Sequence, residues 1–337
     1  MEKILTISIA AYNVEGYIKN ALNSLLVENI EDLEILVEDD GGTDNTANIV
    51  KEYEKKYPNI VKLVHKENGG YGSTINKSIE LARGKYFKQL DGDDWYDSKN
   101  FVDFLELLRK IDADMVYTPF YQFKEKENIY ELKDILNKEL NGECSVRDLF
   151  SKSNNYLNMY TICYKTDILK VGNLKLLEKC FYTDTQYAMY PVVNANTIYI
   201  SHNPIYIYRI GRNEQSVSLV GRIKHYEDHV KVSKDLLEFY NDNLNVDISK
   251  QRYLLNYIIN HVSNTISGYY IILESNKENL KQIIEFEKYI LDKNKIVYDK
   301  MEEQSKIVKI LRKTNYNYVI YKILSKLKIR KMKKSHK

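Results

Sequence analysis

The sequence is poor in cysteine and has no long apolar run. Its three cysteines, Cys144, Cys163 and Cys180, are odd in number and lack metal-ligand spacing. They argue against a disulfide framework and favour core positions in a reducing compartment. No apolar run approaches the roughly 18 residues that a membrane span needs, and no charged-then-apolar signal peptide opens the sequence. We therefore expect a soluble, cytoplasmic protein.

The sequence also lacks a large excess of charge of one sign. Lys and Arg number 50, Asp and Glu number 47, and the formal net charge is +3, which gives no general reason to expect nucleic acid as a partner. The charges are unevenly placed, however. From Gln304 onward there are twelve basic and no acidic residues, so the preceding part of the chain is acidic, with 38 basic against 47 acidic residues.

Four apolar runs alternate with segments of helical spacing in the first hundred residues. The runs cover 3–11, 33–37, 60–65 and 84–90, and helices are expected at about 14–27, 45–57 and 74–83. This alternation predicts a mostly parallel sheet with helices on both faces. Ligands of such sheets bind outside the carboxyl ends of the strands.

A polar cluster follows each of these four runs. The clusters are Tyr12-Asn13, Asp39-Asp40-Gly41, the loop 68–73 and the segment 91–94. Because the carboxyl ends of parallel strands share one edge of the sheet, we expect the clusters to form a single site. The loop has three glycines before a helix, so Asn68, Ser73 and the backbone N–H groups are candidate phosphate contacts. An ordinary flexible turn is the alternative.

The segment 91–94 holds three carboxylates, Asp91, Asp93 and Asp94, interrupted only by Gly92. Acids this close repel one another and need a cation at the end of a buried strand. Their oxygen ligands favour Mg²⁺ or Mn²⁺. The alternative is an acidic turn that caps the next helix, with Asp94 or Asp97 as N-cap.

Two common nucleotide-binding patterns are absent. The turn after the first strand lacks Gly-x-Gly-x-x-Gly, and the chain has no Walker A lysine motif. A nucleotide would therefore be held by other means. Asp39 or Asp40 is a candidate acceptor for a base N–H, and Tyr12 is a candidate for packing on the ring. Taken alone, Tyr12 is also compatible with a core aromatic and Asp40 with a helix cap.

Three segments carry a family resemblance: IAAYNVE at 9–15, VEDDGGTDNT at 37–46 and LDGDDW at 90–95. They resemble the signature segments of family 2 glycosyltransferases, which have the GT-A fold. The resemblance implies an α/β protein with a Rossmann-like mixed sheet flanked by helices, here with an α-helical C-terminal extension. It also implies that the tyrosine and the aspartate after the second strand hold the nucleotide base, that Asp91 contacts the ribose and that Asp93 binds the metal.

The expected donor contacts occupy the rim of the sheet and the strand near 209. They are Ala10, Tyr12, Asn13, Asp39, Asp40, Asn68, Ser73, Asp91, Gly92 and Arg209, and the expected metal ligands are Asp91 and Asp93. The chain departs from the family pattern at three positions. Ala10 stands where Pro is usual, Gly42 where Ser is usual, and Glu38 where an apolar residue is usual, which puts only the local packing of Glu38 in question.

The middle of the chain is expected to bind the acceptor. Residues 114–117 predict a fifth strand, 121–140 a hairpin or lid, and 145–151 and 165–171 short helices. The segment 181–191 resembles the family's Glu-Asp segment, which implies that Asp184 is the general base; an N-cap role for Asp184 is the alternative. The segment 204–218 resembles the family's closing segment. Its Arg209 and Arg212 are candidates for a diphosphate or an anionic acceptor, or for surface charges paired with the acidic body.

The remaining chain shows helical spacing at 223–240, 250–273, 277–291 and 307–327. The last segment combines an apolar face with lysines, which suits an anionic membrane surface. A helix packed on the body is the alternative. Since the aromatic-basic interleaving of an RNA module is absent, we expect peripheral contact with the inner face of the cell membrane and no nucleic acid. An oligomer is compatible with the sequence.

We therefore predict an inverting glycosyltransferase. Its GT-A domain would cover 1–218, with a nucleotide-binding half at 1–118 and an acceptor-binding half at 119–218, before a helical region at 219–337. It would move a sugar from a UDP-sugar to a glycan or lipid-linked acceptor in surface polysaccharide or glycolipid assembly, using Mn²⁺ or Mg²⁺. The alternatives are a non-catalytic scaffold that binds nucleotide sugars or glycans, and a nucleotidyltransferase, which the lack of a Gly-rich triphosphate loop disfavours.

Overall fold

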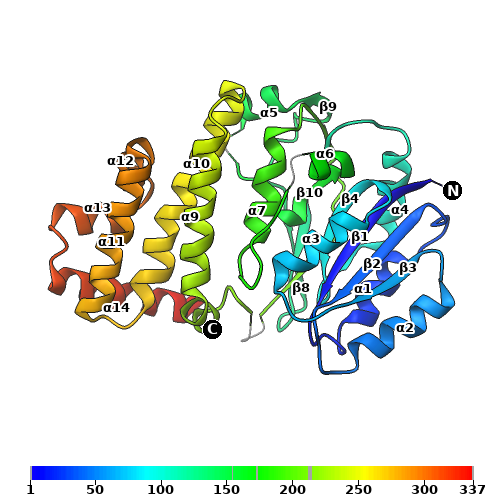
Figure 1. The fold of residues 1–337 in the computed structure, drawn as a ribbon, viewed down its shortest axis with the longest axis horizontal. Helices are drawn as coiled ribbons and strands as arrows, with labels where there is room; N and C mark the ends of the chain where they lie inside the picture. Colours follow the sequence, from blue (N-terminus) through cyan, green and yellow to red (C-terminus); the bar gives the residue numbers. More distant parts are fainter. Residues whose placement is uncertain (1, 154, 172–173, 212–214, 336–337) are drawn as a thin grey trace. The chain divides into compact units, whose positions relative to one another are not determined.

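The computed structural model describes residues 2–153, 155–171, 174–211 and 215–335. Its contacts separate two units, Met1–Ile210 and Gly211–Lys337. The first unit contains all the described strands, and the described part of the second is built from helices (Figure 1).

The beginning of the first unit alternates strands and helices, as expected. The strands are β1 (Lys3–Ala11), β2 (Leu33–Asp39), β3 (Val61–His65) and β4 (Gly84–Asp91), and the helices between them are α1 (Ile18–Leu25), α2 (Thr46–Lys56) and α3 (Tyr71–Leu81). All four strands are parallel and stand in the order β3-β2-β1-β4. Leu5, Ile7 and Ile9 of β1 are completely buried, because this sheet is covered on both faces.

The order of the strands reverses between β1 and β4, which decides where a ligand can bind. Right-handed crossovers then place α1 and α2 on one face of the sheet and α3 on the other. In agreement, α1 contacts α4 (Ser98–Leu108), and α3 contacts α6 (Thr166–Val171) (Figure 1). The carboxyl ends of β1 and β4 are therefore the switch point at which open α/β sheets bind ligands.

Beyond β4 the sheet continues with strands of mixed direction. β10 (Ile162–Lys165) pairs antiparallel with β4, and β6 (Met115–Tyr117), β11 (Thr197–Ile200) and β9 (Gly142–Ser145) complete an eight-stranded sheet. β6 confirms the fifth strand expected at 114–117. The fold is a mixed α/β sheet flanked by helices, as the resemblance to GT-A proteins implies.

A second, four-stranded sheet has the order β5 (Trp95–Tyr96), β12 (Tyr206–Ile210), β7 (Phe120–Lys124) and β8 (Ile129–Lys133). β7 and β8 are antiparallel and confirm the hairpin expected within 121–140. The sequence pattern does not predict β5, because two residues show no periodicity. Its pairing with β12 joins the acidic segment to the strand that carries Arg209.

The short elements of the first unit agree with the sequence in most places. α5 (Val146–Lys152) and α6 confirm the two short helices, and α7 (Asp184–Met189) confirms the helix after residue 181. Asp97, and not Asp94, is the N-cap of α4, where its Oδ1 accepts a hydrogen bond from Asn100 N at 2.9 Å. All three cysteines are free thiols; Cys163 and Cys180 are buried and Cys144 is half-buried.

The second unit is helical. Its α-helices are α8 (Leu219–Lys224), α9 (Tyr226–Asp242), α10 (Ile248–Asn264), α11 (Lys277–Lys293), α12 (Lys295–Gln304), α13 (Lys306–Lys313) and α14 (Tyr318–Ser335), and a π-helical turn (Thr265–Tyr269) and a 3-10 turn (Tyr270–Ile272) follow α10. The sequence pattern does not predict α12, because this helix buries only Val297 and Met301, too few residues to show a helical period. Within the described residues, no helix has both the length and the apolarity that crossing a bilayer requires.

The single helix expected at 307–327 is wrong, because α13 ends at Lys313 and α14 begins at Tyr318. Asn315 and Tyr316 between them have φ of 45° and 53°, a left-handed conformation that ends a helix. The buried Glu287 carboxylate holds this break, since it accepts hydrogen bonds from Tyr316 Oη and from Arg312 Nε, the latter at 3.1 Å. Periodicity alone misses the break because the polar turn fits an exposed helical position.

Candidate active site

The carboxyl ends of β1, β2 and β4 are joined by backbone hydrogen bonds. Gly92 N donates to Ala10 O at 3.0 Å, and Asp40 N donates to Ala11 O at 2.9 Å. A Cβ atom on Gly92 would lie 2.9 Å from Ala10 O, so the close approach of the acidic segment to β1 requires glycine between the aspartates. The structure thus brings Ala10, Asp40 and Gly92 to one rim.

Three carboxylates gather directly beyond β4. One oxygen from each of Asp91, Asp93 and Asp94 lies within 4.8 Å of the others. The buried Asp94 accepts hydrogen bonds from Tyr206 Oη at 2.7 Å and from Arg209 N at 2.8 Å, which commits it to the protein. Burial raises the pKa of Asp94, and the charge of Asp91 raises it further. Asp91 and Asp93 are less buried than Asp94 and are therefore the better candidates to hold a divalent cation, which prefers carboxylate oxygens and relieves such repulsion.

Tyrosines hold Asp91 in place. Tyr71 Oη donates a hydrogen bond to Asp91 Oδ1 at 2.7 Å, and Asp91 N donates to Tyr206 Oη at 3.2 Å. Tyr71 is the first residue of α3, the helix on the opposite face of the sheet from α1. The start of α3 therefore orients the carboxylate of Asp91 at the end of β4. The ring of Tyr160 packs against that of Tyr206, with centroids 4.9 Å apart, and so adds a third aromatic ring to Tyr71 and Tyr206.

The charges of Asp184 and Asp91 affect the same two tyrosines, Tyr71 and Tyr160. Burial is the main cause that raises the pKa of Tyr71, and the charges of Asp91 and then Asp184 raise it further. Both carboxylates also raise the pKa of Tyr160, after burial and Tyr208. The two acids come from β4 and α7, which are about ninety residues apart in the chain. The 3-10 turn Met159–Thr161, which contains Tyr160, contacts both elements and so brings them together.

The environment of Asp184 favours a basic carboxylate. Thr183 is the N-cap of α7 and Asp184 its first residue, so the N-cap interpretation of Asp184 is wrong. Burial raises the pKa of Asp184, opposed by the N–H groups of Thr185 and of Asp184 itself. The side chain keeps partial exposure. A carboxylate with a raised pKa is a stronger base near neutral pH.

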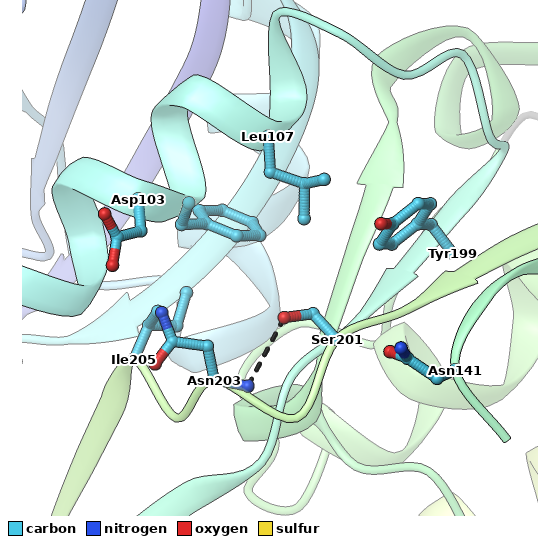
Figure 2. A pocket seen from close by; sticks show the side chains of 8 residues that line it. Asp103, Leu107, Asn141, Tyr199, Ser201, Asn203 and Ile205 are labelled. Atoms are coloured by element: carbon cyan, nitrogen blue, oxygen red, sulfur yellow. Dashed lines mark hydrogen bonds between the residues drawn. The ribbon is translucent and has the colours of Figure 1, made fainter. Parts of the chain in front are cut away.

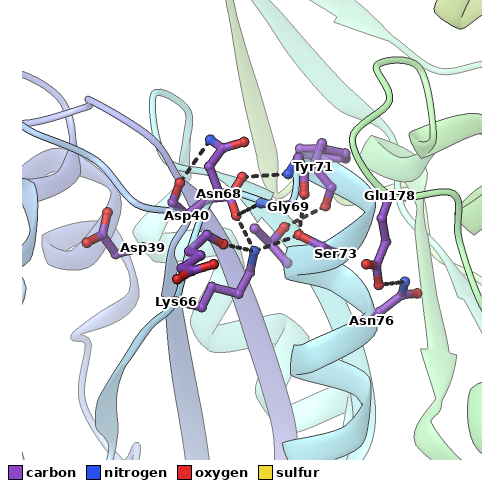
Figure 3. A network of polar contacts seen from close by, with 12 residues as sticks. Asp39, Asp40, Lys66, Asn68, Gly69, Tyr71, Ser73, Asn76 and Glu178 are labelled. Carbon is purple, nitrogen blue, oxygen red and sulfur yellow. Dashed lines mark hydrogen bonds and ion pairs between the residues drawn. The ribbon is translucent and has the colours of Figure 1, made fainter.

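Asp40 is the centre of a polar network where β2 and β3 end (Figure 3). Its carboxylate accepts hydrogen bonds from Gly69 N and Gly70 N, both at 2.9 Å, and forms an ion pair with Lys66. Asn68 Nδ2 donates to Asp40 O at 2.9 Å. The network anchors the loop after β3 to the end of β2, so Asn68 and Asp40 do belong to one cluster.

Lys66 and Ser73 extend this network to α3, which begins three residues earlier than expected. Ser73 Oγ accepts a hydrogen bond from Lys66 Nζ at 2.6 Å and donates one to Gly70 O at 2.6 Å. The sequence interpretation missed Lys66. Its position directly after β3 was a usable signal, because the other rim residues follow β1, β2 and β4 in the same way.

Asp39 and Asn13 hold the neighbouring turn. Asp39 is completely buried, its Oδ1 accepts a hydrogen bond from Gly42 N at 3.2 Å, and its Oδ2 lies 2.7 Å from His65 Nδ1. Asn13 Oδ1 accepts from Thr43 N at 2.8 Å. Both side chains therefore point at protein groups and shape the rim.

Tyr12 is exposed at this rim. Its exposed fraction is 54%, so the interpretation as a core aromatic is wrong. The interpretation of Asp40 as a helix cap is wrong as well, because at the start of α2 the backbone N–H of Thr46 donates to Asp44 Oδ1 at 2.9 Å. An exposed aromatic ring beside the Asp40 network is an arrangement that suits a nucleotide base.

Arg209 is hydrogen-bonded to the backbone of the acidic segment. Its Nε donates a hydrogen bond to Asp93 O at 3.1 Å, and its guanidinium lies 4.7 Å from the ring centre of Trp95. Its Nη1 is ion-paired with Glu125 Oε1 at 2.5 Å, and the side chain is only 11% exposed. This geometry fits the alternative, a charge paired with the acidic body, and it positions the backbone of Asp93; the expected donor contact of Arg209 stays a prediction. Arg212 lies outside the described residues.

Glu38, which stands where the family pattern is apolar, is completely buried beneath this rim. Its Oε1 accepts a hydrogen bond from Ser78 Oγ of α3 at 2.9 Å. Its Oε2 has no hydrogen-bond partner among the described residues. Burial raises the pKa of Glu38 to about 7, against the opposing effects of Ser78 and Lys66.

We expect Glu38→Gln to remove a pH dependence of stability. The Glu38 carboxyl titrates near 4.5 when unfolded and near 7 when folded, so the folded state holds the extra proton between these values. The free energy of unfolding should therefore fall by about 3 kcal/mol as the pH rises through this window. Urea unfolding of wild type and Glu38→Gln at about pH 5 and about pH 8 measures it. The exposed Glu52→Gln is the control, and equal pH slopes in wild type and Glu38→Gln would contradict the prediction.

Two hollows lie on the first unit. A cavity of about 220 Å³ lies between α4 and the end of β11, and Figure 2 shows Asp103, Leu107, Tyr199 and Ser201 among its lining residues. A groove of about 610 Å³ is lined by residues that include Lys66, Ser73, Asn76, Lys77 and Glu178. The groove adjoins the Asp40 network, whereas the cavity shares no residue with the predicted site.

Known families and proteins agree with this geometry. Residues 6–181, slightly more than half of the chain, match Glycosyl transferase family 2. The uncharacterised glycosyltransferase EpsJ of Bacillus subtilis is 26% identical over 249 residues, which are 72% of this chain and 71% of EpsJ. The uncharacterised glycosyltransferase MG060 of Mycoplasma genitalium is 27% identical over 241 residues, 69% of this chain and 78% of the relative.

Solved structures show the same fold. S. aureus TarS in complex with UDP-GlcNAc superposes with a TM-score of 0.57 at 20% identity, over 89% of this chain and 92% of that one. The mannosyltransferase PcManGT of Pyrobaculum calidifontis, in complex with GDP-Man and Mn²⁺, gives a TM-score of 0.50 at 11% identity, over 97% and 87%. Together with the match over more than half of its length, these findings establish that the chain belongs to glycosyl transferase family 2.

Proposed function

We propose that this glycosyltransferase moves a sugar from a UDP-sugar to a hydroxyl group of a glycan or lipid-linked acceptor, with inversion at the anomeric carbon. The observation that carries the proposal is that one 3-10 turn, Met159–Thr161, contacts both β4, which ends at Asp91, and α7, which begins at Asp184. A carboxylate on the donor side and a basic carboxylate on the acceptor side then belong to elements that pack on the same turn. The complex of TarS with UDP-GlcNAc supports UDP as the carrier.

On the donor side, the exposed Tyr12 packs on the base and Asp40 accepts a hydrogen bond from it, while Asp91 contacts the ribose. Ala10, Asn13, Asp39 and Gly92 shape the rim around these groups, and Asn68 and Ser73 border the diphosphate. Mn²⁺ or Mg²⁺ held by Asp91 and Asp93 would neutralise the charge that builds on the leaving diphosphate. The structure of PcManGT with Mn²⁺ supports this ion.

On the acceptor side, Asp184 takes the proton from the hydroxyl as the oxygen attacks the anomeric carbon from the face opposite UDP. One displacement inverts that centre. The raised pKa of Asp184 makes it a better base. Arg209 holds the backbone of Asp93 and thus positions the cation ligands.

We assign the transferase domain to 1–218, with the nucleotide-binding half at 1–118 and the acceptor-binding half at 119–218, and the helical region to 219–337. The reaction serves surface polysaccharide or glycolipid assembly, at the inner face of the membrane to which the basic helices bind. The names of relatives such as EpsJ support only the transferase activity. The place in assembly rests on the basic character of the chain after Gln304.

A thermal-shift screen of nucleotide sugars with and without Mn²⁺ tests the donor. A ligand that binds only the folded state stabilises it by mass action, by about 2.7 kcal/mol at a hundred times its dissociation constant. We expect UDP-sugars with Mn²⁺ to raise the unfolding temperature and GDP-sugars not to do so. The reverse order would refute the UDP assignment, and binding without any release of UDP to added acceptors would favour the non-catalytic scaffold.

A further inference from the structure

We infer that the outer face of α14 is a binding surface for a bilayer with anionic head groups. The inference gives the proposed membrane contact a defined helix face and rests on that part of the proposed function. It is independent of the transfer reaction, because all the residues concerned belong to the helical unit.

α14 is fixed to its own unit through one face. Tyr321 and Ser325 are completely buried, and Ser275 Oγ donates a hydrogen bond to Ser325 Oγ at 2.8 Å. Tyr318 Oη donates to Ser275 O at 3.0 Å, and Tyr321 Oη donates to Glu274 O at 3.4 Å. These contacts determine which side of the helix is turned outward.

The outward side carries a row of apolar residues. Val319 is 63% exposed, Ile323 48% and Leu327 56%. Their spacing of four places them one above the other on a single face. Single exposed apolar side chains are common, but a row along one helix indicates contact with another apolar surface.

Basic residues border this row. α14 contains no Asp or Glu, and Lys326, Arg330, Lys331 and Lys333 are exposed. In the described part of the chain, none of these four is ion-paired with an acidic side chain. Lys326 and Arg330 follow Val319 at about two and three helical turns and so point in nearly the same direction, which puts apolar and positive groups on the same side.

This combination selects a bilayer over other partners. A second copy of the helix would bring equal positive charges together, which is unfavourable. A polyanion would pair with the bases but leave Val319, Ile323 and Leu327 in water. An anionic bilayer satisfies both, since apolar side chains enter the acyl boundary and bases meet the head groups.

Co-sedimentation of the full chain with vesicles tests the inference. We expect binding to phosphatidylcholine vesicles that contain about a third phosphatidylglycerol, and little binding to pure phosphatidylcholine. Combined serine substitutions at Val319, Ile323 and Leu327 should weaken binding about tenfold or more. Combined Lys326→Gln, Arg330→Gln and Lys333→Gln should weaken it roughly a hundredfold, at about fivefold per base.

A matched control removes the same charge elsewhere. Lys51, Lys55 and Lys62 are exposed on the first unit, and their combined change to Gln should leave vesicle binding unchanged. Full binding by either α14 variant, or an equal loss in the control, overturns the inference; full binding by the serine variant would point to a polyanion site. Release of UDP to a soluble glycan, measured in parallel, should stay at wild-type rate in all variants, so that a failed donor assignment is recognised separately.

Discussion

Asp184→Asn is expected to slow the release of UDP to an acceptor about a thousandfold, because loss of a general base typically costs a hundredfold to ten-thousandfold. Asparagine keeps the size of the side chain and its place as the first residue of α7, but it cannot take a proton. In the proposed mechanism the rim residues bind the donor, so the affinity for UDP should change little. This split between turnover and binding distinguishes a base from a residue that merely supports the fold.

The control for this variant is Asp167→Asn. Asp167 also lies in the first turn of a short helix, α6, and is exposed. It should retain wild-type turnover and wild-type UDP affinity. The assignment of Asp184 fails if Asp184→Asn keeps its rate within about tenfold of wild type, or if it loses UDP binding to the same extent as turnover.

Asp93→Ala is expected to abolish the stabilisation by UDP-sugar that depends on Mn²⁺, together with turnover. It removes one of the two carboxylates that fit the cation, and metal stabilisation of a leaving diphosphate is worth several kcal/mol, so we expect the rate to fall by about a thousandfold or more. The readout besides activity is the thermal shift: UDP-sugar should stabilise the variant equally with and without Mn²⁺.

Two further variants give this prediction its controls. Asp103→Ala removes an exposed acid on α4, at the cavity in Figure 2, and should behave as wild type. Asp94→Asn should lower the unfolding temperature even without ligand, because Asp94 accepts hydrogen bonds from Tyr206 and from the backbone of Arg209. A dependence on Mn²⁺ that survives in Asp93→Ala contradicts the assignment of the cation.

The elements of the first unit could largely be predicted, because periodicity is a property of neighbours in the sequence. The strands β1 to β4, the helices between them and the rim clusters that follow them all agree with the pattern. The errors lie where local signals compete with distant contacts. The helix expected at 307–327 breaks at Asn315 and Tyr316, because the Tyr316 hydroxyl donates a hydrogen bond to Glu287, nearly thirty residues earlier.

The hydrogen-bond partners of the individual aspartates could not be predicted in the same way. Asp91, Asp93 and Asp94 look equivalent in the sequence, yet Asp94 is committed to the strand that carries Tyr206 and Arg209, more than a hundred residues later. The same holds for Asp39 and Asp40, of which one is locked by His65 and the other by Lys66 and the glycine loop.

By itself, the sequence determined the alternation of strands and helices, the rim on which the polar residues gather and the family, since these depend on spacing along the chain. Only the tertiary structure decided which distant groups each carboxylate pairs with, and that the elements carrying Asp91 and Asp184 pack on one turn. The physical reason is that burial and hydrogen-bond partners set the state of an acid, and the groups that supply them lie far away in the sequence.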